Sequence, residues 1–188
     1  IYLINKTARV STKPISFAIM SIAFYIWCID SFRSRFCSSS INLYNFLMNN
    51  NFLKKPFTKI TGKIISFEIN DKSTKKVTNF YKDNPFPHYK NDDNKGSILQ
   101  KGNKNLLASQ FKKFIGHNKN VLEVGCGTGQ LSIYFSIGTN NNVVGLDPTI
   151  ESLKLASNFA EKNEIENVNF INADIFDDVL KDNSFDHI

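Results

Sequence analysis

Apolar runs alternate with helical repeats over the second half of the chain. Three short apolar runs have the length of buried strands, and they occupy residues 121–124, 142–147 and 167–174. Apolar residues also recur at helical spacing over residues 106–115, 130–135 and 150–160. This alternation of strands and helices predicts an α/β fold with a parallel sheet.

Three glycines stand at alternate positions directly after the first of these strands: Gly125, Gly127 and Gly129. A glycine turn between the carboxyl end of a strand and the start of a helix is how an open α/β sheet forms a nucleotide site. Glycine suits this turn because the backbone needs positive φ and because a side chain would fill the space of the ligand. The spacing differs from the dinucleotide fingerprint G-x-G-x-x-G, whose last position is here Gln130.

The segment from Glu123 to Gly129 reads E-x-G-x-G-x-G and resembles the first signature of class I S-adenosylmethionine-dependent methyltransferases. The resemblance implies that the glycine loop passes under the methionine part of S-adenosylmethionine and that Glu123 faces the ammonium group of this cofactor. The loop residues concerned are Gly125, Cys126, Gly127 and Gly129. The cofactor carries no phosphates, so a site with close backbone approach and a carboxylate matches its chemistry.

Two later acids extend the resemblance. Asp147 ends the second strand 22 positions after Gly125, near the interval of ~20 residues typical of an acid that binds ribose hydroxyls. Pro148 follows it and suits a first helical turn, so Asp147 also fits a purely structural role at the start of a helix. Past the third strand, the resemblance implies that Asp174 accepts a hydrogen bond from the adenine amino group and that Ile175 packs on the adenine ring.

The resemblance covers residues 106–188, and residues 182–188 are similar to the family's approach to its fourth strand. The implied fold is a Rossmann-like parallel sheet with helices on both faces, incomplete, with three strands plus the start of a fourth and an irregular N-terminal extension. Because the family's sheet has seven strands, we interpret the chain as a fragment truncated after the start of the fourth strand. We expect this fragment alone to be inactive, and we identify no catalytic residue in it.

The first quarter of the chain differs from the rest in composition. Residues 1–47 contain all three arginines, the only Trp, and +4 of the formal charge of +6. Their apolar run at 14–29 fits a signal or anchor segment, a buried helix of a small extra domain, or sequence that is not native to the protein, and we favour the last. We therefore divide the chain into residues 1–47, a basic extension at 48–103, and the N-terminal half of a methyltransferase domain at 104–188.

The basic extension contains three features of interest. Residues 63–69 alternate as a strand does, and residues 91–104 are predicted to form a loop because they are polar, lysine-rich and contain two glycines. Residues 80–89 carry aromatic side chains on a segment that Pro85 and Pro87 hold extended. A similar segment precedes the glycine strand in some bacterial methyltransferases, so this one is either a lid over cofactor or substrate or a packed linker.

Charge and composition limit the partners. Residues 48–119 hold 15 Lys against 5 acids, and residues 120–188 hold 3 Lys against 11 acids, which indicates an anionic substrate or attraction between the two segments. The sequence contains no known nucleic-acid module, so nucleic acid is not predicted as a partner, and a membrane is predicted only if residues 14–29 are an anchor. The three cysteines form no disulfide framework and the three histidines are isolated, so we expect a cytoplasmic protein without a metal site.

The predicted function is S-adenosylmethionine-dependent methyl transfer to an unidentified acceptor. One alternative is half of an NAD-type oxidoreductase, which the position of the third glycine and the charge of Glu123 disfavour. The other alternative is a non-catalytic module that binds S-adenosylmethionine.

Overall fold

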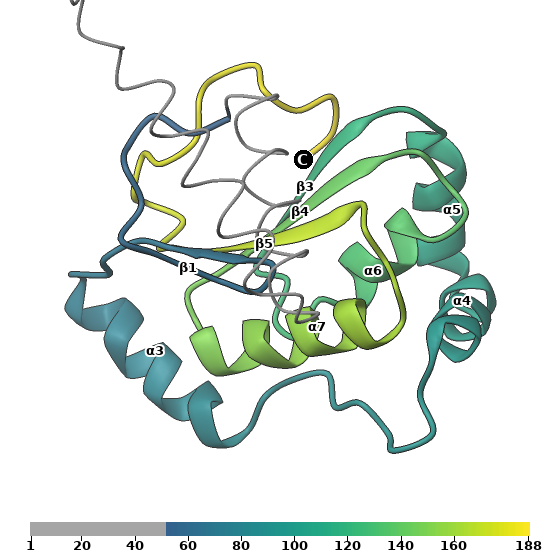
Figure 1. The fold of residues 1–188 in the computed structure, drawn as a ribbon, viewed down its shortest axis with the longest axis horizontal. Helices are drawn as coiled ribbons and strands as arrows, with labels where there is room; N and C mark the ends of the chain where they lie inside the picture. Colours follow the sequence, from purple (N-terminus) through teal and green to yellow (C-terminus); the bar gives the residue numbers. More distant parts are fainter. Residues whose placement is uncertain (1–51) are drawn as a thin grey trace, which may run out of the picture. The chain divides into compact units, whose positions relative to one another are not determined.

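The computed structural model describes residues 52–188 (Figure 1). The apolar run at 14–29, the boundary at Met48 and the other predictions for residues 1–47 lie outside this part. Within residues 52–188, none of the helices is both long and apolar enough to cross a membrane.

One five-stranded sheet forms the centre of this part, in the order β1-β2-β5-β4-β3. The strands are β1 (Lys59–Thr61), β2 (Ile64–Ser66), β3 (Asn120–Val124), β4 (Asn142–Asp147) and β5 (Val168–Asn172). The helices are α3 (Lys72–Asp83), α4 (Lys95–Lys104), α5 (Leu106–Ile115), α6 (Gln130–Ser136) and α7 (Ile150–Lys162). All strands and helices predicted for residues 106–174 are therefore present.

The three predicted strands pair in parallel, β3 with β4 and β4 with β5. Every residue of β5 is buried, as is every residue of β4 after Asn142, because both faces of the sheet are covered here. The α/β, Rossmann-like fold predicted from the sequence is confirmed.

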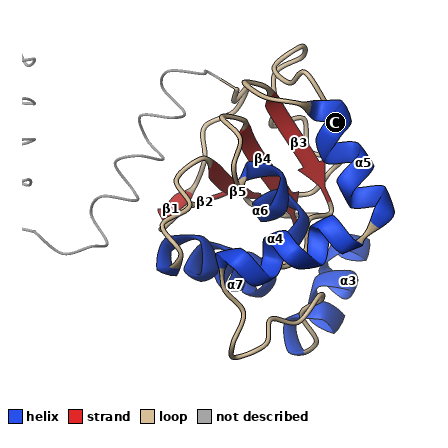
Figure 2. Ribbon diagram, turned by 90° about the vertical axis from the view of Figure 1, so that its right-hand side faces the viewer, coloured by secondary structure: helices blue, strands red, loops and turns tan. Residues whose placement is uncertain are grey.

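The described helices lie on one side of the sheet (Figures 1 and 2). Right-handed crossovers explain this, because the order β3, β4, β5 advances in one direction and places both crossover helices, α6 and α7, on the same face. A second apolar cluster covers the other face, and loop residues such as Phe52 and Val179 contribute to it. The expected helices on both faces are thus seen on one face only within residues 52–188.

The strand count differs from the sequence expectation at the edge formed by β5. The basic extension contributes β2, which pairs in parallel with β5, and β1, which pairs antiparallel with β2. At the other edge, His187 forms a single parallel bridge with Val121, and its carbonyl accepts the N–H of Leu122 (2.9 Å). This bridge corresponds to the predicted start of a fourth strand.

The loop predicted at residues 91–104 is wrong, because most of this stretch forms α4. The side chain of Asn94 accepts the N–H groups of Gly96 and Ser97, and the hydroxyl of Ser97 accepts the N–H of Asn94, which completes a capping box. Gly102 serves packing, since an added Cβ would lie 2.2 Å from the ring of Tyr134 in α6. The glycine that suggested a loop therefore allows two helices to approach closely.

Candidate cofactor site

The glycine loop connects β3 to α6 and folds back over the end of β4. Gly125, Gly127 and Gly129 all have positive φ, of 73°, 54° and 70°. The N–H groups of Gly125 and Cys126 both donate to the carbonyl of Leu146, at 2.8 and 3.1 Å. The loop is thus fixed at the carboxyl ends of two adjacent parallel strands, where open α/β sheets bind ligands.

The three glycines differ in what surrounds them. A Cβ added at Gly127 would lie 2.3 Å from the carbonyl oxygen of Phe86, and one added at Gly129 would lie 2.7 Å from the ring of Phe170. A Cβ added at Gly125 would meet no atom within 4 Å. Packing therefore requires glycine at 127 and 129, whereas the space beside Gly125 is open to a ligand.

Asp147 ties the glycine loop to the start of α7. One of its carboxylate oxygens accepts the N–H of Gly127 (2.9 Å) and the other accepts the N–H of Thr149 (2.7 Å). The residue is buried, yet each carboxylate oxygen has a second lone pair that could accept a further donor. Its helix-start contact is therefore present, and its predicted contact with ribose stays a prediction.

Glu123 stands at the carboxyl end of β3 and accepts a hydrogen bond from the hydroxyl of the fully buried Ser132. Burial raises the pKa of Glu123 to about 7, and the nearby charge of Asp147 adds to the rise, whereas the Ser132 hydrogen bond opposes it. The carboxyl group is therefore close to half-protonated at neutral pH.

A pocket of about 330 Å³ opens beside this carboxyl group. Its lining includes Glu123, Gly125, Cys126, Phe86, Pro87 and Lys101. Cys126 is buried and contributes a compact filler, and burial raises the pKa of its thiol well above the ordinary value, so it is no thiolate at neutral pH.

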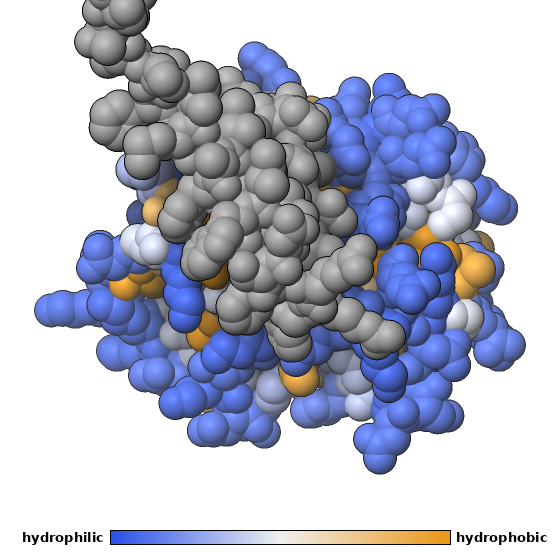
Figure 3. Space-filling model, viewed as in Figure 1, coloured by the Kyte–Doolittle hydropathy of each residue, from blue (hydrophilic) through white to orange (hydrophobic). Residues whose placement is uncertain are grey.

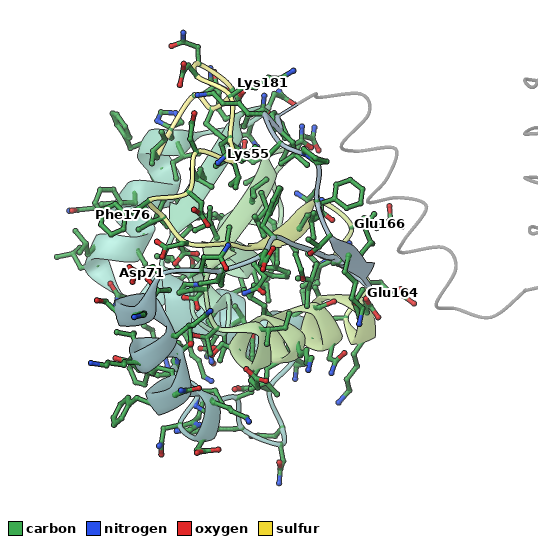
Figure 4. The ribbon with its side chains drawn as sticks, turned by 90° about the vertical axis from the view of Figure 1, so that its left-hand side faces the viewer. Lys55, Asp71, Glu164, Glu166, Phe176 and Lys181 are labelled. Atoms are coloured by element: carbon green, nitrogen blue, oxygen red, sulfur yellow. The ribbon has the colours of Figure 1, made fainter. Side chains whose placement is uncertain are left out.

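Asp174, two residues past β5, is buried beneath the first turn of α3. Its carboxylate accepts the hydroxyl of Thr74 (2.5 Å) and the N–H of Phe176 (3.0 Å). Ile175 and Phe176 remain exposed, at 57% and 91%, and Phe176 lies at the edge of the protein on the same side as Asp71 (Figure 4). A buried acceptor beside exposed apolar side chains suits a flat ring that carries an amino group.

The aromatic-proline segment packs directly on the glycine loop. The hydroxyl of Thr128 donates to the carbonyl of Pro87 (2.6 Å), and the hydroxyl of Tyr89 donates to the carbonyl of Thr128 (2.8 Å). The ring of Tyr89 also stacks on Phe159, with the ring centroids 4.4 Å apart. Of the two sequence interpretations, packing against the loop is observed, and it places the segment on the wall of the pocket.

Sequence reasoning did not single out Thr128, Ser132 or Thr74. Thr128 and Ser132 are fully buried although they are polar, and each donates to a group of the site. Their position within or just after the glycine signature could have identified them as site residues. Thr74 gave none, because it lies 100 residues before its partner Asp174.

The acids Glu123, Asp147 and Asp174 thus stand at the carboxyl ends of three adjacent parallel strands, beside a loop with one open glycine. A family model described as a methyltransferase domain matches residues 115–188. Residues 115–188 therefore match a methyltransferase domain, and their Rossmann-like fold and E-x-G-x-G-x-G segment resemble those of class I methyltransferases. The cofactor of this class is S-adenosylmethionine, as the sequence predicted, and the residues present fit its ammonium, hydroxyl and amino groups.

Two curated relatives of this methyltransferase domain differ in their acceptors. An uncharacterized RNA methyltransferase of Mycoplasma mobile is 35% identical over 71 residues, which are 38% of this chain and 19% of that protein. The release factor glutamine methyltransferase of Fusobacterium nucleatum is 30% identical over 96 residues, or 50% of this chain and 27% of that protein. The chain therefore spans less than a third of the length of either relative.

A solved structure similar to the methyltransferase domain is an S-adenosylmethionine-dependent methyltransferase from Geobacter sulfurreducens in complex with S-adenosyl-L-homocysteine. It is 16% identical, with a TM-score of 0.34, over 55% of this chain and 37% of the other. A likeness at this score adds nothing to the assignment, which depends on the family match.

Proposed function

We propose that the protein transfers a methyl group from S-adenosylmethionine to an acceptor, with the cofactor lying across the carboxyl ends of β3, β4 and β5. The observation that carries this proposal is the open space at Gly125 beside a loop whose other two glycines are closed by packing. Dinucleotide binding by an oxidoreductase half is the weaker alternative, because Glu123 would put a carboxyl group where a pyrophosphate should lie.

Each site residue has one proposed role toward the cofactor. Glu123 would bind the ammonium group, Asp147 the ribose hydroxyls, and Asp174 the adenine amino group. Gly125, Cys126, Gly127 and Gly129 would form the surface under the methionine part, with Pro148 and Ile175 beside the ribose and the adenine ring. Each of these three donor groups of the cofactor would thus have one carboxylate as its hydrogen-bond acceptor.

When bound, S-adenosylmethionine would supply a methyl group on a positively charged sulfur. An acceptor nucleophile in line with the carbon–sulfur bond takes the methyl group, and the sulfur is the leaving group. The chain's own contribution is to orient the two reactants, an effect worth up to ~7–11 kcal/mol in favourable cases. Phe86 and Pro87 line the pocket beside Glu123 and would exclude water from the methionine end. We assign no general base to residues 52–188.

The acceptor class stays open between the two kinds named for the relatives, RNA and protein. A non-catalytic binding module would keep the same cofactor site, so turnover alone separates it from an enzyme.

Calorimetric titration of the purified protein with S-adenosyl-L-homocysteine and with NAD tests the proposal. We expect micromolar affinity for the first and none for the second.

A matched pair of variants sharpens the test, because Gly125 and Gly138 both have positive φ and open space at Cβ, but only Gly125 lies in the site. Gly125→Ala should weaken binding at least tenfold, whereas Gly138→Ala should leave it unchanged. Binding of NAD alone would overturn the assignment.

A further inference from the structure

The outward side of α3 combines lysines and aromatic rings. Lys72, Lys76 and Phe80 follow one another at intervals of four residues, so they form one row along the helix, and Lys75 lies on the next row. Phe80 is 66% exposed, and Tyr81, whose ring meets that of Phe80 edge to face at 5.2 Å, is 42% exposed.

None of the residues of α3 is buried. The helix carries four lysines, at 72, 75, 76 and 82, against the single acid Asp83. The surface over α3, at the lower left of Figure 3, is largely hydrophilic with small apolar patches. The aromatic rings of α3 are therefore exposed to solvent, and packing within the domain does not explain why aromatic residues stand at these positions.

Both ends of α3 connect to the candidate cofactor site. In its first turn, the hydroxyl of Thr74 donates to Asp174 (2.5 Å). Just after its last turn, the carbonyl of Phe86 accepts the N–H of Thr128 in the glycine loop (3.3 Å). A strand that follows α3, which is about 18 Å long, would therefore run between two segments that border the candidate cofactor site.

We propose that the outward face of α3, formed by Lys72, Lys75, Lys76 and Phe80, binds single-stranded nucleic acid and presents it as the methyl acceptor. This inference rests on the proposed function. Lysines neutralise backbone phosphates, and exposed aromatic rings offer a stacking surface to unpaired bases, which is the combination that single-strand binding uses.

An anionic membrane surface suits the helix less well. A helix that lies in a membrane interface presents a broad apolar face opposite its charged face. In α3 the row that contains Phe80 also contains Lys72 and Lys76, and the opposite side faces the protein through Thr74 and Thr78, which are the half-buried residues of the helix. The charge also exceeds what a neutral peptide partner would require.

The test uses a fluorescein-labelled 12-nucleotide RNA of mixed sequence and the matching single-stranded DNA, added to the whole protein and followed by fluorescence anisotropy. The double variant Lys72→Ala/Lys76→Ala should weaken binding about tenfold at moderate salt and should lower the slope of log affinity against log salt by about two. Phe80→Ala should weaken binding several-fold and leave that slope unchanged.

The matched control is Lys154→Ala, which removes an exposed lysine from α7 and should change neither quantity. The RNA and DNA arms distinguish the source of the strand, since tighter binding of RNA assigns a ribonucleic acceptor and tighter binding of DNA a deoxyribonucleic one. Absence of binding to both strands, an equal effect of Lys154→Ala, or binding to phosphatidylserine vesicles in place of nucleic acid would overturn the inference.

Calorimetry with S-adenosyl-L-homocysteine, run on the same preparations, keeps the two proposals apart. The α3 variants should retain the cofactor affinity of the parent protein, because their substituted side chains lie outside the cofactor site. Cofactor binding without nucleic-acid binding refutes this inference alone, whereas loss of cofactor binding in the parent protein refutes the proposed function.

Discussion

Asp147 organises the candidate site before any ligand is present, because its two carboxylate oxygens hold the N–H groups of Gly127 and Thr149. If it also binds both ribose hydroxyls, Asp147→Ala should weaken S-adenosyl-L-homocysteine binding at least tenfold, since a hydrogen bond to a charged group contributes ~1.5–3 kcal/mol. The variant should also lower the free energy of unfolding by about 1–3 kcal/mol, because two backbone donors lose their acceptor.

Calorimetry and urea denaturation measure these two effects of Asp147→Ala. The exposed acid Asp92 provides the control, since Asp92→Ala should change neither quantity. An unchanged cofactor affinity in Asp147→Ala would reduce Asp147 to a helix-start residue.

Glu123 should make both stability and cofactor affinity depend on pH, in opposite directions. Its folded pKa of about 7 lies above the ordinary value of 4.5, because burial disfavours the charged form. The protein without ligand therefore keeps this stabilising contribution below pH 4.5 and loses it as the pH rises through 7.

The ammonium group of the cofactor needs the ionised form of Glu123. Affinity should rise about tenfold between pH 6 and pH 8, because the ionised fraction rises by that factor around a pKa of about 7. Titrations at several pH values check this, with Glu123→Gln as the variant that should flatten the profile. A parallel pH profile in parent and variant would show that Glu123 does not contact the ammonium group.

The residues that the sequence identified are those whose role follows from the local chain. Gly125 and Gly127 need positive φ in a turn whose ends are both visible in the sequence. The hydroxyls of Thr74 and Ser132 donate to acids in other elements. The sequence around a small polar side chain does not show which distant residue it will contact after folding, so these two residues were not predictable.

Among the elements, the contact between the glycine loop and the aromatic-proline segment should be sensitive to one added methyl group. Gly127→Ala places a Cβ 2.3 Å from the carbonyl oxygen of Phe86, whereas Gly138→Ala meets no atom within 4 Å at a similar φ. Both variants bear left-handed backbone strain of ~1–2 kcal/mol, and Gly127→Ala adds overpacking of ~1–3 kcal/mol.

Denaturation curves of the two glycine variants test this difference, and hydrogen exchange over residues 84–89 tests its location. We expect Gly127→Ala to be the less stable variant and to expose these amides. Equal stabilities would mean that the segment does not pack on the loop as described.

Helices and strands with a clear apolar period were predictable, and those without one were not. The strand at residues 142–147 and the helix at residues 106–115 were predicted at their observed bounds. α3 has no buried residue and α4 has one, Ile98, so neither shows the apolar stripe on which a sequence-based assignment depends. The capping box at Asn94 and Ser97 was the stronger local signal for α4.

Among the residues that the structure describes, the basic segment that ends at residue 119 and the acidic segment 120–188 share one sheet and three ion pairs. Lys54 lies 2.7 Å from Asp178 and 3.2 Å from Asp182, and Lys119 lies 3.6 Å from Asp186. These pairs are largely exposed and screened by solvent, so packing must hold the two segments together. The charge split seen in the sequence therefore remains available to an anionic partner.

Two chains that begin at different residues test how much of the N-terminal part the domain needs. A chain beginning at Met48 should retain cofactor affinity. A chain beginning at Glu68 should not fold, because it lacks four of the apolar side chains that are buried within residues 52–188, those of Phe52, Ile64, Ile65 and Phe67. Each contributes ~1.5–3 kcal/mol, which together approaches the whole stability of a typical domain, ~5–15 kcal/mol.

Circular dichroism and calorimetry compare the two shortened chains with the full one. Loss of binding or aggregation in the chain that begins at Met48 would show that residues 1–47 are a structural element. Partition of the full chain into membranes would instead support the anchor interpretation of residues 14–29.

The central claim is that three acids and an open glycine at the carboxyl ends of β3, β4 and β5 bind S-adenosylmethionine. The most direct test is a crystal structure of the protein with S-adenosyl-L-homocysteine bound. The account predicts the ammonium group at Glu123, the ribose hydroxyls at Asp147, the adenine amino group at Asp174, and the homocysteine chain over Gly125. A ligand bound at any other edge of the sheet, or one that leaves Asp147 and Asp174 without contact, would contradict it.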